Sequence, residues 1–215
     1  MVSAQSKNGC AVYDQNLFKD LRDAKLAART CKNCPLWERA TQTVFGEGPV
    51  PASLMLVGEQ PGDREDARGA PFVGPAGKLL DDALEQAGID RSLAYVTNAV
   101  KHFKWEPSGR RRLHKKPSAR EIEACRPWLL TEIEFVRPRV IVSLGATAAA
   151  SLLGKDFRIS GKRGQFVESL YAPKILVTVH PAAILRILDK RMRDMEFRHF
   201  VEDLSIVQSW TTAWM

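Results

Sequence analysis

Four short apolar runs, each continuous rather than alternating, constrain the fold of this chain more than any other feature. They cover residues 54–58, 94–97, 140–144 and 175–179. Continuous apolarity over such short lengths is typical of parallel strands that are covered on both faces. Because segments with helical periodicity separate the runs, the sequence predicts an α/β fold, a three-layer α/β/α sandwich around a central four-stranded parallel sheet.

Capping residues mark the boundaries of the helices. The predicted helices cover residues 17–30, 79–87, 118–133, 146–153 and 197–208. Ser118 followed by Glu121 has the spacing of a capping box, and Gly88 and Gly154 each follow the last periodic residue of a helix. The chain has 215 residues and contains no internal repeat or linker, so we expect one domain over residues 1–215, with a flexible segment at residues 1–16.

Composition and hydropathy are those of an ordinary globular protein. Hydrophobic residues make up 45% of the chain and charged residues 27%, which excludes global disorder. The longest stretch of small and apolar residues, 140–154, is too short to span a bilayer, and the first ten residues lack the apolar core of a signal peptide. We therefore expect a cytoplasmic protein with no membrane partner.

Polar residues follow three of the four apolar runs. Glu59 and Gln60 come after the first run, Asn98 after the second and His180 after the fourth. Parallel sheets bind ligands beyond the carboxyl ends of their strands. Asn and His also cap or turn the chain at strand ends, which is the simpler interpretation of each residue taken alone. Their occurrence at three strand ends favours one shared binding site.

The positive charge of the chain is concentrated in one segment. The net charge is +7, and residues 101–116 carry seven basic residues and one acid, Glu106. The basic residues are Lys101, Lys104, Arg110, Arg111, Arg112, Lys115 and Lys116. Pro107 and Gly109 predict a loop, which follows Asn98 at the edge of the expected site. Such a run is often only a solvated surface, but its position favours contact with nucleic-acid phosphates.

The cysteines supply a candidate metal site. Structural disulfides are rare in the cytoplasm, and Cys31 and Cys34 have the spacing of metal ligands. Cys125 is the third candidate, although it also fits its helix face as a small buried residue. The fourth ligand is Cys10 or His102, and we favour His102 because Cys10 lies in the segment expected to be flexible. Such a set can hold zinc or an iron–sulfur cluster, and spacing does not distinguish them.

Three common catalytic motifs are excluded. Residues 74–79 resemble a phosphate loop but lack its four-residue gap, and Leu79 replaces the Ser or Thr that binds Mg²⁺. The CxxC pair precedes the first strand, which argues against a thioredoxin-like site. No Gly-x-Ser-x-Gly sequence supports a serine hydrolase.

Five motifs, in family order, resemble those of the uracil-DNA glycosylase superfamily. They are Gly58-Glu-Gln-Pro-Gly-Asp63, Pro71-Phe-Val-Gly-Pro-Ala-Gly77, Val96-Thr-Asn-Ala-Val-Lys101, Cys125-Arg-Pro-Trp-Leu129 and Val179-His-Pro181. The chain is most similar to the iron–sulfur family 4 branch. Its segment Arg111-Arg-Leu-His-Lys-Lys-Pro117 and the Gln of the first motif resemble UdgX-type proteins, which crosslink themselves to uracil-containing DNA. Family 4 has a cysteine ligand where this chain has His102, as UdgX-type proteins do.

The resemblance implies a pocket for a uracil that is flipped out of DNA. Phe72 would stack on the base, Asn98 would read its polar edge, and His180 would hydrogen-bond its O2 as negative charge develops. The implied substrate-binding residues are Gly58, Gln60, Asp63, Phe72, Asn98, Arg112, Lys115, Lys116 and His180. The implied ligands of a [4Fe–4S] cluster are Cys31, Cys34, His102 and Cys125.

The resemblance also implies an enzyme that ends bound to its own product. After excision His114 would attack C1′ of the abasic sugar, Glu59 would orient it and take its proton, and Gln60 would have a supporting role. We therefore predict a monomeric, single-turnover DNA-repair glycosylase, associated with the nucleoid through uracil-containing DNA, single-stranded or double-stranded. The alternatives are a conventional glycosylase that turns over with water and a protein that binds uracil-DNA without cleavage.

Overall fold

The computed structural model of the chain describes residues 18–211. Its centre is a five-stranded sheet with the order β2-β1-β5-β7-β6. The parallel strands are β1 (Leu54–Gly58), β2 (Ala94–Asn98), β5 (Val140–Leu144) and β7 (Lys174–Thr178). They match the four apolar runs, so the predicted parallel sheet is confirmed. The prediction omitted β6 (Gln165–Val167), an antiparallel edge strand that is too short for its pattern to be recognised.

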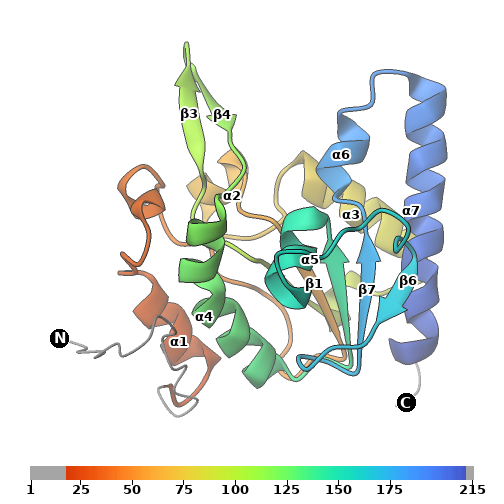
Figure 1. Cartoon of the computed structure of the whole chain (residues 1–215), viewed down its shortest axis with the longest axis horizontal. Coiled ribbons are helices and arrows are strands. Elements are labelled where there is room, and N and C mark those ends of the chain that lie inside the picture. Colours follow the sequence, from red (N-terminus) through yellow and green to blue (C-terminus); the bar gives the residue numbers. More distant parts are fainter. Residues whose placement is uncertain (1–17, 212–215) are drawn as a thin grey trace.

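Helices cover both faces of this sheet and form the predicted three-layer sandwich (Figure 1). The long helices of the two outer layers are α3 (Pro75–Gln86), α4 (Ala119–Val136), α5 (Ala146–Leu153) and α7 (Lys190–Thr211). Leu56 of β1 packs in the cluster that contains α3 and α7, and its neighbour Val57 packs in the cluster that contains α4 and α5. Successive side chains of a strand point to opposite faces, so both layers must be present to bury an uninterrupted apolar run.

Local signals set most of the helix boundaries. The predicted capping box of Ser118 and Glu121 begins α4, and α5 ends before Gly154 as expected. The helix α7 begins at Lys190, seven residues before the predicted start, because its first two turns are largely charged and carry no apolar stripe. No helix within residues 18–211 combines the length and the hydropathy needed to cross a membrane.

The remaining elements connect these layers. They are α1 (Leu21–Ala28), the 3₁₀ helices η1 (Pro35–Glu38) and η2 (Arg91–Leu93), α2 (Asp63–Arg68), β3 (Trp105–Ser108), β4 (Arg111–His114) and α6 (Pro181–Leu185). The side chain of Asp20 caps α1, which therefore begins later than the predicted residue 17. The segment 1–16 that was expected to be flexible lies outside the described residues.

The basic segment forms a hairpin and not the predicted loop. Strands β3 and β4 pair in antiparallel fashion, with Trp105 opposite His114, and the chain turns at Gly109, where φ is 59°. The hairpin projects from the body of the protein above the sheet (Figure 1). Its prolines and charges concealed the alternation of exposed and half-buried residues that runs along β4. The hairpin places His114 at its base.

Candidate active site

A cavity of about 480 Å³ opens at the carboxyl ends of the parallel strands, between the hairpin and α6. Glu59 and Gln60 follow β1, Asn98 ends β2, and His180 follows β7; all four line the cavity. The structure therefore brings together the residues that were predicted at three strand ends. Other predicted site residues, Asp63, Phe72 and His114, line the same cavity.

Gly58 makes room for two side chains of this cavity. It lies opposite Asn98 in the β1–β2 register. A Cβ atom at Gly58 would lie 2.4 Å from Oδ1 of Asn98 and 2.7 Å from Cζ of the Phe72 ring. Any larger residue would therefore displace the amide or the ring, which accounts for glycine at the end of β1.

Asn98 presents an unpaired amide to the cavity. Only 2% of the residue is exposed, and its side chain forms no hydrogen bond with another described residue. The amide faces the cavity and is not one of the sealed, unpartnered polar atoms of the core, so it is free to pair with a ligand that offers a matching donor and acceptor. The Phe72 ring forms a flat apolar wall beside this amide.

His180 is a neutral hydrogen-bond donor. Its Nδ1 accepts a hydrogen bond from the backbone N–H of Ala182 at 3.1 Å, so the neutral ring carries its proton on Nε2. Burial, the charge of Arg186 and, once it is protonated, the charge of His114 together lower the pKa of His180 to about 4. The ring stacks against Phe72 with 6.1 Å between centroids. At neutral pH this imidazole can donate to a developing anion while itself uncharged.

Glu59 and His114 form a carboxylate–imidazole pair. Oε2 of Glu59 accepts a hydrogen bond from Oγ1 of Thr147 on α5, and Oε1 lies 3.6 Å from Nε2 of His114. Burial lowers the pKa of His114; the charge of Glu59 opposes this effect and that of Arg186 adds to it. His114 is therefore a neutral nitrogen nucleophile with a proton acceptor beside it.

Gln60 joins the hairpin to the sheet. It is 6% exposed, and its Nε2 donates to the carbonyl oxygens of Lys104 and Lys115 at 3.2 and 3.0 Å. Its Oε1 accepts from the backbone N–H of Lys104 at 3.1 Å. One amide thus holds both ends of the hairpin against β1.

Sequence reasoning missed two residues of the site. Thr147 follows β5, the one strand whose carboxyl end was not considered, and the same strand-end argument would have found it. Arg186 follows α6 and lines the cavity, where its charge lowers the pKa of both His114 and His180. The side chain of Arg186 forms no ion pair with a described residue, so it can bind an anion. A basic residue soon after His180 was the available signal.

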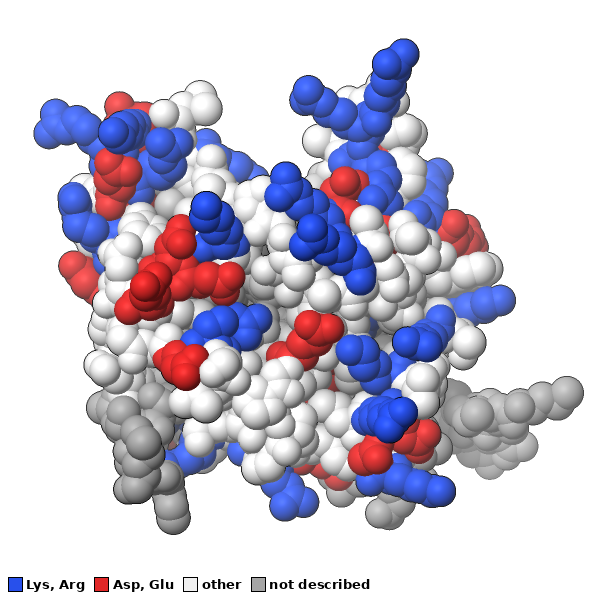
Figure 2. Space-filling model, turned by 180° about the vertical axis from the view of Figure 1, so that it is seen from behind, with Lys and Arg blue, Asp and Glu red and all other residues white. Residues whose placement is uncertain are grey.

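Most of the basic segment is neutralised within the protein. Ion pairs join Lys101 to Glu132, Lys104 to Glu121, Arg112 to Asp63 and Asp66, and Lys115 to Glu106. Lys101, which was counted in the basic segment, is completely buried and so adds nothing to its exposed charge. Of the seven basic residues, Arg110, Arg111 and Lys116 have no ion-pair partner in the described part of the chain. Figure 2 shows Lys and Arg side chains on the protruding hairpin and near the start of α7, on either side of a hollow.

Three cysteines approach one another beside the hairpin base. Cys31 follows α1, Cys34 caps η1 and Cys125 lies in α4; Cys31 acts electrostatically on Cys34, and both of these thiols act on Cys125. Burial raises the pKa of Cys34, and raises that of Cys125 to about 12. His102 is 5% exposed, and burial lowers its pKa. Cys10 lies outside the described residues.

Two N–H groups are directed at the sulfur atoms. The indole N–H of Trp128 donates to Sγ of Cys31 at 3.2 Å, and the backbone N–H of Lys101 donates to Sγ of Cys125 at 3.1 Å. Within residues 18–211, no group of three His, Cys, Asp or Glu side chains is arranged to hold a metal ion. Three thiols and an imidazole are nevertheless a donor set that can bind zinc or an iron–sulfur cluster, and N–H groups directed at two of the sulfur atoms suit sulfur that carries negative charge.

Comparisons with known proteins agree with this geometry. The family model described as "Uracil DNA glycosylase superfamily" matches residues 45–205. The type-4 uracil-DNA glycosylase of Thermotoga maritima is 38% identical over 183 residues, which are 85% of this chain and 90% of the relative. That of Saccharolobus solfataricus is 39% identical over 186 residues, 82% of this chain and 83% of the relative. The type-5 uracil-DNA glycosylase of Pyrobaculum aerophilum is 31% identical over 103 residues, 45% of this chain and 40% of the relative. The cavity lies wholly inside the matched range.

Proposed function

The chain belongs to the uracil-DNA glycosylase superfamily, and from this membership we propose that it excises uracil from DNA and then bonds through His114 to the abasic sugar, as UdgX-type proteins do. The names of its type-4 relatives support excision. The observation that carries the covalent step is the position of His114, whose imidazole reaches the cavity from the hairpin and meets the Glu59 carboxylate.

Asn98 and Phe72 form the recognition surface for the base. Uracil presents an acceptor at O4 beside a donor at N3, which an amide can match with its own donor and acceptor. Cytosine reverses this pattern and would leave buried groups unpaired, a mismatch that costs large factors in rate. Because the amide of Asn98 has no partner in the described protein, it is available for this pairing.

His180 and Arg186 supply the electrostatics of cleavage. When the C1′–N1 bond breaks, its electron pair leaves with uracil, and negative charge spreads to O2. The neutral Nε2–H of His180 donates to that oxygen, and one such preorganised donor is worth about 10²–10³ in rate. Arg186, which has no ion-pair partner among residues 18–211, is placed to bind a DNA phosphate at the mouth of the cavity.

His114 captures the sugar that uracil leaves. One ring nitrogen bonds to C1′ as a cationic sugar develops, and the proton that the alkylated imidazole must lose passes to Glu59. Thr147 fixes the other carboxylate oxygen and so directs Oε1 toward the ring. Water would compete for C1′ only if His114 were absent or displaced.

Cys31, Cys34, Cys125 and His102 are the residues that would hold a [4Fe–4S] cluster. A cluster there would join α1, η1, α4 and the base of the hairpin by covalent bonds, and so stabilise the frame of the site. The chain's own N–H groups from Trp128 and Lys101 would hydrogen-bond its sulfur ligands.

One gel experiment tests the proposal. The protein is incubated with a labelled uracil-containing oligonucleotide and run under denaturing conditions, and free uracil is quantified in parallel. We expect one adduct per uracil released, and no adduct with His114→Ser. Released uracil in excess of protein, with no adduct, would instead establish a conventional glycosylase, and neither product would establish a binding protein.

A further inference from the structure

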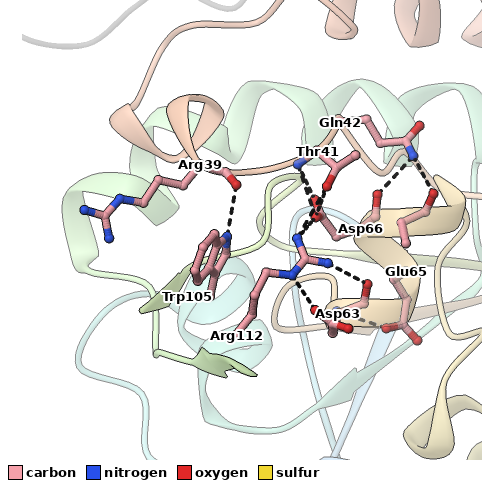
Figure 3. A network of polar contacts seen from close by, with 10 residues as sticks. Arg39, Thr41, Gln42, Asp63, Glu65, Asp66, Trp105 and Arg112 are labelled. Atoms are coloured by element: carbon pink, nitrogen blue, oxygen red, sulfur yellow. Dashed lines mark hydrogen bonds and ion pairs between the residues drawn. The ribbon is translucent and has the colours of Figure 1, made fainter. Parts of the chain in front are cut away.

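Arg112 is fully engaged by partners within the protein. Its Nη1 donates to Oδ2 of Asp66 at 2.6 Å, its Nε donates to Oδ1 of Asp63, and its Nη2 donates to the Asp63 carbonyl at 3.2 Å (Figure 3). All three guanidinium nitrogens are therefore bound to α2. The side chain is 25% exposed, and its Cζ lies 5.4 Å from the ring centroid of Phe103, which precedes the hairpin, and 5.6 Å from that of Trp105 on β3.

The partners of Arg112 are themselves fixed. The Asp66 side chain is completely buried and accepts hydrogen bonds from the backbone N–H and the hydroxyl of Thr41, at 2.9 and 2.6 Å. The indole N–H of Trp105 donates to the carbonyl of Arg39 at 3.0 Å, in the same connecting segment (Figure 3). Arg112 thus attaches the hairpin to a rigid part of the body.

Arg112 and His114 lie on the same face of β4. Alternate residues of a strand point to one side, and here Arg112 and His114 are half-buried while Arg111 and Leu113 are exposed. An isolated two-stranded hairpin is at best marginally stable in water. Its position must therefore come from contacts with the body, which include Gln60 at its base, Trp105 on β3 and Arg112 along its inner face.

We infer that Arg112, held by Asp63 and Asp66, is a positioning residue that keeps His114 in the cavity and so decides whether His114 or water takes the sugar. The inference deepens the proposed function and rests on it. Displacing a reacting group by about 1 Å can cost about 10²-fold in rate. Asn98 and His180 sit on other elements, so uracil excision would continue while capture by His114 failed.

The same contacts argue against phosphate binding by Arg112. Two carboxylates surround one guanidinium, which leaves this corner with a net negative charge that repels a phosphate. A phosphate would also have to replace the buried Asp66, which would then lack its cationic partner. Arg111, one residue earlier, is exposed and has no ion-pair partner among the described residues, so it is the better phosphate ligand on β4.

Arg112→Gln and Arg111→Gln form a matched pair for the test. On a single-stranded oligonucleotide with one uracil, we measure the ratio of released uracil to adduct, and the affinity for the same strand without uracil. Arg112→Gln should raise the ratio at least about tenfold, because water reaches C1′ when His114 is displaced. Arg111→Gln should lower the affinity for the oligonucleotide with and without uracil alike, and should leave the ratio of released uracil to adduct near one. Arg112→Lys keeps the positive charge but loses the planar guanidinium that donates to both carboxylates. Its ratio of released uracil to adduct should lie between those of the two Gln variants.

Hydrogen–deuterium exchange without DNA separates this inference from the proposed function. Arg112→Gln should accelerate exchange of the amides of residues 105–114 at least about tenfold, and Arg111→Gln should not, because only the first releases the hairpin. If the wild type forms no adduct, the covalent proposal fails and exchange alone decides whether Arg112 holds the hairpin. Unchanged exchange and an unchanged product ratio in Arg112→Gln, with a general loss of DNA affinity, would overturn the inference and make Arg112 a phosphate ligand.

Discussion

Oε1 of Glu59 lies 3.6 Å from Nε2 of His114, across the junction between the central sheet and the hairpin. The distance is longer than a hydrogen bond, and catalytic contacts of this kind often tighten only when substrate is bound. The pair joins a carboxylate fixed by Thr147 to an imidazole whose position depends on Gln60 and Arg112. Its chemistry therefore depends on the attachment of the hairpin.

The pH dependence of adduct formation tests the state of His114. The neutral imidazole is the nucleophile, so the rate falls as pH drops through its pKa. Because burial lowers that pKa, we expect the rate to stay constant down to the ordinary imidazole range near 6.5 and to fall only below it. Single-turnover gels at a series of pH values measure this. A rate that already halves above pH 6.5 would contradict the assignment.

Glu59→Gln separates the two roles of the carboxylate. The substitution removes a proton acceptor, which should slow adduct formation about 10²-fold or more. It also removes the charge that raises the pKa of His114, so the acidic limb of the profile should move to lower pH. If Glu59→Gln lowers the maximal rate of adduct formation but leaves the pH at which the rate falls unchanged, Glu59 acts without contacting His114.

Asn98→Asp tests base recognition. An ionised carboxylate has only acceptors, so it cannot donate to uracil O4, and we expect excision to fall about 10²–10³-fold. Gel-shift affinity for uracil-free DNA of the same sequence should stay within about twofold, because the amide is buried and contacts no phosphate. Equal losses on both DNAs would show that Asn98 serves the general DNA interface instead.

The sheet and its edge were predictable because the signals are local. Leu54–Gly58 contains no polar side chain and Val140–Leu144 only Ser143, and the residues that follow strands of a parallel sheet meet at one edge whatever the loops do. Thr147 was within reach of that same argument.

The hairpin and its ion pairs were not predictable, for a physical reason. Arg112 meets Asp63 and Asp66 from 49 and 46 residues away, and Lys101 meets Glu132 from 31 residues away. The net charge of residues 101–116 counts only the acid within the segment. It leaves out the acids elsewhere in the chain that pair with these basic residues, so it overestimates the positive charge that is available to DNA. Partners so distant in sequence are set by tertiary packing and leave no local pattern.

The corrected charge distribution predicts a smaller salt dependence of DNA binding. Each phosphate contact to a single strand contributes about 0.7 to the slope of log affinity against log salt. Replacing Arg110, Arg111 and Lys116 by Gln should therefore reduce the slope by about 2. The ammonium of Lys104 pairs with Glu121 at 2.8 Å, so Lys104→Gln should change the slope by much less. Binding titrations from low to moderate salt decide, and equal changes in both variants would contradict the distinction.

The cysteine ligands predict a coloured protein. Cys34→Ala should abolish the brown colour and reduce soluble yield, because ligation contributes to folding. Trp128→Phe should keep the colour but lower the reduction potential of the cluster, since a hydrogen bond to a ligand sulfur favours the more negative reduced form. Trp37→Phe is the matched control, because that indole lies against Lys32 and not against sulfur. A colourless protein with stoichiometric zinc would contradict the cluster.

The buried pair of Lys101 and Glu132 predicts a large loss of stability when either partner is removed. Both side chains are completely buried, and Glu132 also accepts hydrogen bonds from the Tyr95 hydroxyl at 3.1 Å and the Gly46 backbone N–H at 2.7 Å. Glu132→Gln removes the carboxylate and leaves a buried ammonium without its counter-charge. Breaking such a pair typically costs about 3–5 kcal/mol, which urea denaturation would show as a lower midpoint at unchanged slope.

The double variant Lys101→Met with Glu132→Gln distinguishes charge burial from simple loss of packing. Removing the ammonium as well should recover part of the lost stability, because the cost of Glu132→Gln alone is mainly that of an uncompensated charge. Uracil recognition should not recover with it, since Nζ of Lys101 donates to the Asn98 carbonyl at 2.7 Å and so fixes the end of β2. Strictly additive losses of stability in the double variant would show that the pair contributes only its volume and its separate hydrogen bonds.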